Sequence, residues 1–216
     1  MAELPDSGMR DPAAELSLNL SMAQPKLFSY RRCPYAIRVR MALHEKGIEF
    51  QVVEEDLKNK SAELLSLHPE SRVPLFIHDD LAIYESSVIT EYVNEAFPGT
   101  NLMPSSPQAR AKVRLWTVWC NHILKPEIDR LKYEKNEDVI AKSNHDVLKH
   151  LQKLEDALSE SDYLVENSFS LADIHLFPFI RQITRIKPDI LTSFSKSNSW
   201  FERIRERSSF KKAMEK

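Results

Sequence analysis

The chain changes character near residue 100, and this change limits the folds open to it more than any other feature. Before that point, short runs of β-branched and aromatic residues alternate with amphipathic segments of helical period. Proline and glycine interrupt the pattern at residues 97–100 and again at 104–107. Beyond residue 107 the strand signals vanish. The sequence therefore predicts an α/β domain followed by an all-α domain.

The expected elements of the first domain follow the order β-α-β-α-β-β-α. They lie at residues 26–30, 34–46, 50–53, 61–67, 74–77, 81–84 and 86–96. In the second domain, helices are expected at residues 109–132, 138–158, 170–186 and 200–207. Ser170 and Asp173 have the spacing of a capping box. We assign residues 1–24 to a flexible N-terminal tail, 25–99 to the first domain and 106–216 to the second.

The composition narrows the class of partner and the compartment. The formal net charge is -2, which gives no reason to expect nucleic acid or an anionic membrane as a partner. No apolar run has the length of a membrane span, and the N-terminus lacks the pattern of a secretory signal. Two cysteines are too few for a disulfide scaffold, so we expect a cytoplasmic protein. Whether translation starts at Met1 or Met22 stays open.

Cys33 is the main candidate for catalysis. Pro34 follows it, and proline suits the first position of a helix, which places Cys33 at the N-cap. Unpaired backbone N–H groups and the helix dipole favour a thiolate there, and the thiolate is the reactive form. With Arg31 and Arg38 nearby, the sequence predicts a nucleophile whose pKa lies well below that of a free thiol. The alternative is that Cys33 is a small buried hydrophobic residue.

Two further motifs in the first domain each allow a ligand-binding interpretation and a purely structural one. Ser86 follows Glu85 at the start of a helix, where a carboxylate can bind, although simple helix capping is the alternative. Val73 precedes Pro74, and a cis peptide bond there would present the Val73 backbone to an extended peptide. The alternative is a trans proline at the first residue of a strand.

Other candidates in the sequence have simpler interpretations. A hydrophobic pocket between the domains could be lined by Trp116, Trp119, Cys120 and Tyr133, but the helical spacing of the aromatic residues favours the core. Cys120 is interpreted as inert packing. No metal-ligand spacing surrounds the histidines, so no metal is expected, and His122 and His175 are interpreted as structural or surface residues.

The domain order and the motifs resemble the cytosolic glutathione transferase superfamily over residues 26–210. In that family a cis-proline precedes the third strand, as RVP does at residues 72–74. The family grips the γ-glutamyl end of glutathione at the position of Glu85–Ser86, and it carries a buried helix cap at the position of residues 170–173. The sequence CPY at residues 33–35 is similar to the catalytic turn of omega-class and glutaredoxin-like transferases, and LKNK at 57–60 resembles an omega-class segment. The chain therefore resembles an omega-like, cysteine-type bacterial glutathione transferase with a thioredoxin-like N-terminal domain.

The resemblance implies a site, a co-substrate and an oligomer. Glutathione would be the co-substrate, and Cys33 would be the catalytic residue. Ser86 would hold the γ-glutamyl carboxylate, Glu85 the α-ammonium group and Lys60 the glycine carboxylate, while the Val73 backbone would pair with the peptide. The family also implies a homodimer.

The implied reaction is thiol transfer or reduction through a mixed disulfide with glutathione. The substrate would be a small molecule or a glutathionylated thiol, and dehydroascorbate reduction is a variant. Cys33 occupies the turn where mainstream transferases carry tyrosine or serine, which disfavours ordinary conjugation. Ala36 replaces the second cysteine of a C-x-x-C pair, so no internal disulfide forms at this turn. The alternative function is a non-catalytic interaction module of the stringent-starvation-protein type.

Overall fold

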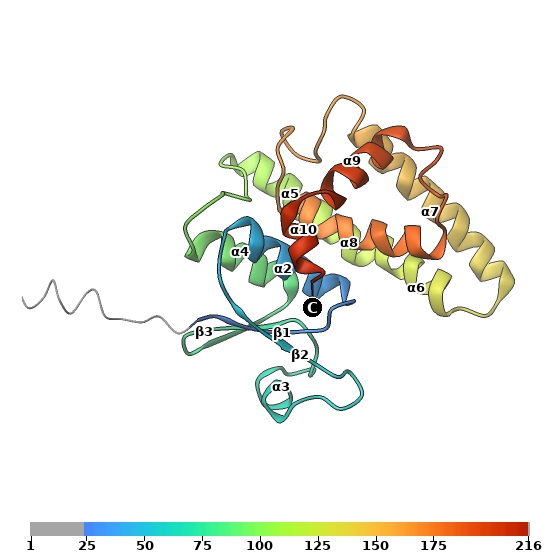
Figure 1. Cartoon of the computed structure of the whole chain (residues 1–216). Coiled ribbons are helices and arrows are strands. Elements are labelled where there is room, and N and C mark those ends of the chain that lie inside the picture. Colours follow the sequence, from blue (N-terminus) through green and yellow to red (C-terminus); the bar gives the residue numbers. More distant parts are fainter. Residues whose placement is uncertain (1–23, 216) are drawn as a thin grey trace, which may run out of the picture.

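The computed structural model describes residues 24–215. Most of the tail expected at residues 1–24 therefore lies outside the described residues. A four-stranded sheet with its helices comes first in the chain, and a group of helices follows (Figure 1). This arrangement confirms the predicted fold class, an α/β thioredoxin-like domain followed by an all-α domain.

The sheet has the strand order β2-β1-β3-β4. Its strands are β1 (Lys26–Ser29), β2 (Gln51–Glu54), β3 (Leu75–His78) and β4 (Leu81–Tyr84). Strand β1 pairs in parallel with β2 and antiparallel with β3, and β3 forms a hairpin with β4. Because β1 lies inside the sheet, its side chains are buried on both faces, with Leu27 in one core cluster and Phe28 in another.

Three helices cover the sheet. Helices α2 (Pro34–Glu45) and α4 (Ser86–Ala96) lie on one face, and α3 (Ala62–Leu67) lies on the other (Figure 1). The Ser61 hydroxyl caps α3 by accepting a hydrogen bond from the Leu64 N–H at 3.2 Å. Leu64 then packs with Phe28, so this short helix closes the second core cluster.

The remaining helices follow the predicted all-helical pattern with three differences. They are α5 (Pro107–Trp119), the π-helical turn η1 (Cys120–Leu124), α6 (Lys125–Tyr133), α7 (Glu137–Ala157), α8 (Leu171–Ile186), α9 (Ser195–Arg205) and α10 (Ser208–Ala213). The helix expected at 109–132 thus contains a π turn. The final helix begins earlier than predicted, and α10 was not predicted at all.

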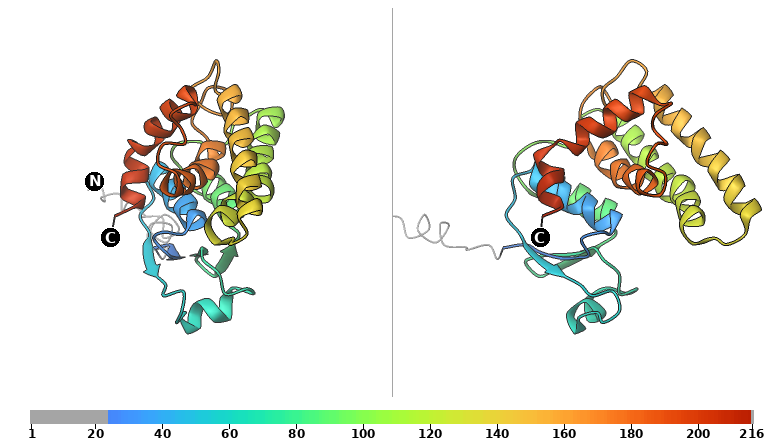
Figure 2. Two further views of the ribbon diagram at one scale, coloured as in Figure 1. Left: turned by 90° about the vertical axis from the view of Figure 1, so that its right-hand side faces the viewer. Right: turned by 45° about the vertical axis from the view of Figure 1, so that its right-hand side comes forward.

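The break between α9 and α10 has a long-range cause. Arg207 adopts an extended backbone conformation, and its guanidinium forms a bidentate ion pair with Glu45, at 2.7 and 2.8 Å. The two residues are 162 positions apart, so local sequence patterns carry no trace of this contact. The ion pair joins α10 to α2, and these two helices lie side by side in both views of Figure 2.

Helix α2 is the structural centre of the molecule. It packs against α4, α8 and α10 and lies over the sheet, so it has little contact with solvent. Even Arg38 and Arg40 on this helix are buried. None of the helices within residues 24–215 combines the length and the apolar character that a membrane span requires.

Candidate functional site

A pocket of about 250 Å³ lies where the first helices meet the helical half of the chain. It contains three of the residues singled out in the sequence, Val73, Glu85 and Ser86. The complete lining is Tyr35, His68, Arg72, Val73, Pro74, Glu85, Ser86, Asn121 and His122.

Cys33 lies at the edge of this pocket. It is the N-cap of α2, as predicted, and its side chain makes no capping hydrogen bond. The Cys33 Sγ atom lies 3.8 Å from the Val73 carbonyl oxygen, which ties the thiol to a residue that lines the pocket. The turn is closed by a hydrogen bond from the Cys33 N–H to the Tyr30 carbonyl, at 2.8 Å. The thiol therefore has a fixed position beside the pocket.

The predicted low pKa of Cys33 is wrong for this structure. Burial raises the pKa of the thiol above its usual range, because the thiolate loses hydration. The N–H groups of Ala36 and Tyr35, followed by the charges of Arg40 and Arg38, act in the opposite direction but do not outweigh burial. The sequence indicated the helix N–H groups and Arg38 correctly, but Arg40 acts where Arg31 was expected. The sequence also could not show how far the turn would be buried.

The backbone before β3 agrees with the prediction. The Val73–Pro74 peptide bond is cis. Among the described residues, no acceptor pairs with the Val73 N–H. The free N–H of Val73 is therefore available at the pocket, and Cys33 lies beside it.

Glu85 and Ser86 lie at the start of α4. Glu85 has a positive φ of 66°, a conformation that non-glycine residues rarely adopt and that clusters at binding sites. Ser86 is 3% exposed, and its Oγ accepts a hydrogen bond from the Arg38 Nη1 group at 3.2 Å. A hydroxyl has one proton to donate, so this contact leaves the Ser86 proton free for an acceptor in the pocket.

Arg38 connects the pocket to the helical half of the chain. Besides Ser86, its guanidinium donates to the His175 carbonyl at 2.8 Å, the Asn121 Oδ1 at 2.9 Å and the Cys120 Sγ at 3.4 Å. It also lies over the ring of Phe179. Burial lowers the pKa of Arg38, and no carboxylate among the described residues forms an ion pair with it. The guanidinium thus fixes both walls of the pocket.

Cys120 and His175 are structural, as predicted. Burial raises the pKa of Cys120 to about 11, so this thiol is inert at neutral pH. Burial likewise lowers the pKa of His175 well below its usual value, which keeps the ring neutral. Both ring nitrogens of His175 have hydroxyl partners, Thr90 and Thr117, each at 2.7 Å.

Lys60, like Cys33, does not belong to the lining of the pocket. It is half-buried beside the start of α3. Burial lowers the pKa of His68, which does line the pocket, and the charges of Arg72 and Lys60 act in the same direction. Lys60 is therefore close enough to influence the site electrostatically, although the structure does not bring it to the wall.

Sequence reasoning missed the contribution of the π turn. Asn121 and His122 both line the pocket, and His122 had been interpreted only as a structural or surface residue. The extra residue of a π turn shifts which side chains face the pocket, and no sequence signal marks it. Trp116 and Trp119 pack against each other under Lys153 and are partly buried against the core, whereas Tyr133 is exposed.

The described residues hold no group of three or more histidine, cysteine or acidic side chains that could bind a metal ion. The pocket instead combines a thiol, a free backbone N–H, a serine hydroxyl and several basic side chains. This set suits an acidic, peptide-like ligand.

Two family models match the chain. The model of the glutathione S-transferase N-terminal domain matches residues 23–95, and that of the C-terminal domain matches residues 103–208. Glutathione S-transferase U28 of Arabidopsis thaliana is 37% identical over 149 residues, which cover 68% of this chain and 66% of the relative. A probable glutathione S-transferase of Nicotiana tabacum is 34% identical and covers 71% of this chain and 68% of the relative. The chain thus spans about two thirds of the length of these relatives.

Solved structures of similar shape include proteins from rice, Trametes versicolor and Methylobacillus flagellatus. Rice GST1 in complex with glutathione has a TM-score of 0.82 at 27% identity, covering 89% of this chain and 90% of that one. Glutathione transferase Omega 3C from Trametes versicolor has a TM-score of 0.81 at 25% identity, covering 94% and 95%.

Proposed function

The chain belongs to the glutathione S-transferase family, and on that premise we propose that it is a glutathione-dependent thiol transferase with Cys33 as its nucleophile. One observation carries the proposal: the Cys33 Sγ lies 3.8 Å from the Val73 carbonyl, at a pocket that Val73 and Ser86 line. A peptide paired with the Val73 backbone would bring its own sulfur to this thiol.

The proposed reaction has two thiol–disulfide exchanges. The Cys33 thiolate attacks the glutathionyl sulfur of a mixed disulfide, and the S–S bond to the substrate breaks. The substrate leaves as a thiolate and takes up a proton from water. A second glutathione thiolate then attacks the glutathionyl sulfur on Cys33, which releases glutathione disulfide and restores the enzyme. Ala36 has no sulfur and Cys120 is buried against Arg38, so neither resolves the adduct.

The direct test is mass spectrometry of the full chain after exposure to glutathione disulfide. We expect one glutathionyl adduct on Cys33 and none on Cys120, because Cys120 is fully buried. A folded protein whose Cys33 stays unmodified would reject the proposal. That result would favour the non-catalytic interaction module, which needs no reactive thiol.

The subtype within the family, the substrate and the individual glutathione contacts also belong to this proposal. The turn sequence CPY at residues 33–35 supports an omega-like, cysteine-type transferase, and dehydroascorbate is a second substrate to assay. The assignment to a bacterial, omega-like subtype rests on the sequence motifs, and the two relatives named above come from plants. Lys60 and Glu85 remain proposed glutathione contacts, for the glycine carboxylate and the ammonium group respectively. A cytoplasmic location remains a prediction.

Replacing Ser86 with alanine should weaken glutathione binding roughly tenfold to a hundredfold, the range for losing one hydrogen bond to a charged group. The physical reason is that the Arg38 contact leaves the Ser86 proton free for a carboxylate. Calorimetry measures the effect. Ser87→Ala is the matched control, since Ser87 is adjacent but lies outside the pocket. Equal affinity in the wild type and Ser86→Ala would reduce Ser86 to a structural residue.

We also propose that the protein is a homodimer. Helices α4 and α5 expose large apolar side chains, with Leu115 67% and Val88 54% exposed. Two ion pairs, Arg114–Glu91 and Arg110–Glu95, join these helices into one surface. Leu115→Glu should therefore shift the mass measured by light scattering from two chains to one. Leu148→Glu, at an exposed site on α7, is the control and should leave the mass unchanged. A wild-type monomer across a wide concentration range would contradict this prediction.

A further inference from the structure

A pocket of about 410 Å³ lies between helices α8 and α9, and arginines dominate its lining. The two helices pack against each other in the orange and red part of Figure 1, and the loop that joins them completes the wall. Arg181 and Arg185 come from α8, and Arg205 comes from α9. The pocket shares no lining residue with the one beside Cys33.

The charge of this lining is not balanced. Glu202 is the one acidic side chain among the described residues that line the pocket. It already forms an ion pair with Arg205, which lies three positions further along α9. Arg181 and Arg185 therefore face the pocket without a carboxylate of the lining to neutralise them.

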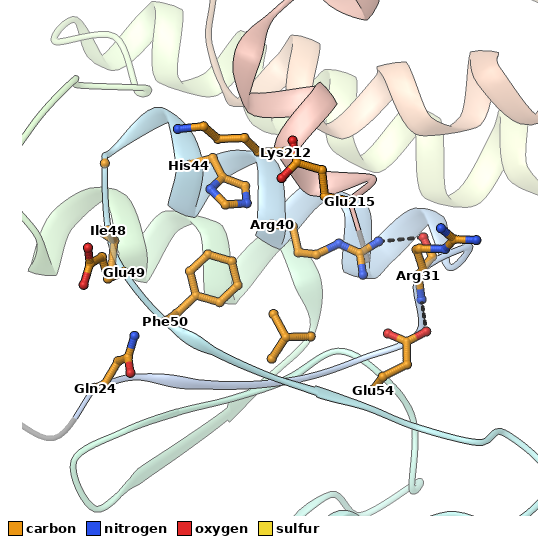
Figure 3. Close-up of a pocket in the computed structure, with 12 residues that line it drawn as sticks. Gln24, Arg31, Arg40, His44, Ile48, Glu49, Phe50, Glu54, Lys212 and Glu215 are labelled. Atoms are coloured by element: carbon orange, nitrogen blue, oxygen red, sulfur yellow. Dashed lines mark hydrogen bonds between the residues drawn. The ribbon is translucent and has the colours of Figure 1, made fainter.

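A larger cavity shows that such an excess of charge is not general in this molecule. It has a volume of about 960 Å³ and lies between β2, α2 and α10 (Figure 3). Burial lowers the pKa of its histidine, His44, which keeps that ring neutral. Its charged residues are three cations and three carboxylates, Arg31, Arg40, Lys212, Glu49, Glu54 and Glu215. Charges thus balance there, whereas the α8–α9 pocket has three arginines against one glutamate.

Arg181 and Arg185 lack polar partners in the part of the chain that the structure describes. Neither guanidinium forms an ion pair or a hydrogen bond with any of residues 24–215. The two residues are four positions apart on α8, so they share a face, and like charges at this spacing destabilise a helix. Burial lowers the pKa of Arg181, and the charge of Arg185 acts in the same direction. The fold therefore keeps two neighbouring cations without compensation.

The helix dipole accounts for only part of this arrangement. Arg185 lies in the last turn of α8, where a cation is favourable. Arg181 lies a full turn earlier, where the dipole has little effect, and it is half-buried over the ring of Phe210. Asp189, the acid closest to Arg185 in the sequence, lines a different pocket with His145. An anion from outside the chain would supply the missing charge.

We propose that this pocket binds a small phosphate monoester, with its phosphate between Arg181 and Arg185 and its polar body against Asn198. A guanidinium matches two phosphate oxygens at once, and a dianion matches two unpaired arginines. Asn198 lines the pocket from α9, and its side-chain amide has no partner among the described residues, so it is available to hydroxyl groups of the ligand. The volume suits a ligand of the size of a sugar phosphate. The site is separate from the glutathione pocket and does not depend on the function proposed above.

The test is calorimetric titration of the full chain at pH 8 and constant ionic strength with ribose 5-phosphate, ribose and inorganic phosphate. Ribose 5-phosphate should bind at least about tenfold more tightly than ribose, because only the ester carries the dianion. Equal affinity for these two probes, or displacement of ribose 5-phosphate by saturating glutathione, would overturn the proposal. Ribose 5-phosphate should also bind more tightly than inorganic phosphate. Equal affinity for those two would overturn the assignment to an ester, because the sugar would then make no contact.

Variants on α8 check which charges hold the phosphate. Arg185→Gln, at an exposed site that should leave the fold intact, should weaken binding of ribose 5-phosphate about tenfold or more, and Arg181→Gln should do the same. Lys187→Gln is the matched control, because it removes one positive charge nearby but lies outside the lining. It should change the affinity less than about twofold. Unchanged binding in Arg185→Gln, or an equal loss in Lys187→Gln, would overturn the proposal.

Glu202→Gln should change the affinity in the opposite direction. It removes the one acid of the described lining and frees Arg205 for the ligand, so ribose 5-phosphate should bind about threefold more tightly or better. A damaged fold does not produce a gain of this kind. An unchanged or lower affinity in Glu202→Gln would overturn the electrostatic basis of the site.

Binding should also stabilise the packing of α8 on α9, because the ligand contacts both helices. Phe201 in the pocket wall stacks on Phe177 of α8, with ring centroids 5.1 Å apart, so the pocket adjoins the core contact between them. Ribose 5-phosphate at about a hundred times its Kd should raise the Tm by about 5 °C or more. Ribose at the same concentration should leave the Tm unchanged. An equal rise in the wild type and Arg185→Gln would place the ligand elsewhere and overturn the proposal.

Discussion

Replacing Cys33 with serine should lower the rate of glutathione exchange by about three orders of magnitude or more, to the uncatalysed level. A serine hydroxyl stays protonated at neutral pH and cannot form a disulfide. The measurement is reduction of a glutathionylated peptide by glutathione, with the wild type and the variant compared at equal concentration. The change is nearly isosteric at a half-buried turn, so the fold should persist.

Cys120→Ser is the matched control for this experiment. Cys120 is fully buried beside Arg38, and burial raises the pKa of its thiol to about 11. Most of the exchange activity should therefore survive in this variant. Substantial exchange by Cys33→Ser would instead remove Cys33 from the mechanism and favour the interaction-module function.

The pH dependence of the wild type follows from the raised pKa of Cys33. Because burial holds this pKa above that of a free thiol, the thiolate is a minor species at neutral pH. The alkylation rate of Cys33 in the free enzyme should therefore keep rising through pH 8 and beyond. A plateau already reached near pH 6 would mean that the helix N-terminus and the arginines outweigh burial after all.

Asp173→Ala should destabilise the fold by on the order of 4 kcal/mol, because it leaves several buried donors without an acceptor. The Asp173 carboxylate accepts from the Trp200 Nε1 at 2.8 Å, the Ser170 N–H at 3.0 Å and the Leu164 N–H at 3.1 Å. It is fully buried and completes the predicted capping box of α8. Denaturant unfolding measures the loss. A change below about 1 kcal/mol, the worth of one ordinary hydrogen bond, would contradict it.

Asp173→Asn separates the titration of this group from its hydrogen bonds. Burial raises the pKa of Asp173 to about 6 in the folded protein, above its value in the unfolded chain. The folded state therefore binds the extra proton, and the stability from this group is present at low pH and lost as pH rises through 6. As pH rises from about 4 to 7, the free energy of unfolding of the wild type should fall relative to that of Asp173→Asn, by on the order of 3 kcal/mol.

Unfolding of the wild type alone cannot isolate this effect. Burial keeps the pKa of His175 well below its unfolded value, so His175 costs stability as pH falls below about 6.5. The two groups act in opposite directions over the same range of pH. Comparison with Asp173→Asn cancels the His175 contribution, because both proteins carry that histidine.

Local sequence patterns were sufficient for most of the fold. The alternation of strand and helix signals up to residue 96 predicted the element order, because each element depends mainly on its own period and on its end residues. Pro34 and Ser86 marked helix starts that the structure confirms, and the pair Ser170 and Asp173 marked a third. The domain boundary near residue 106 stays a prediction.

The features that tertiary structure decided all depend on contacts between distant residues. The burial that raises the pKa of Cys33 comes from packing around α2, which its local arginines cannot reveal. The π turn brings Asn121 to Arg38 across 83 positions, and the pairing of Arg207 with Glu45 separates α10 from α9. The sequence by itself therefore determined the order of the strands and of most helices, and it placed Cys33 at a helix N-cap. Only the folded structure determined how the Cys33 thiol ionises and which side chains surround it, because desolvation depends on neighbours that are distant in the sequence.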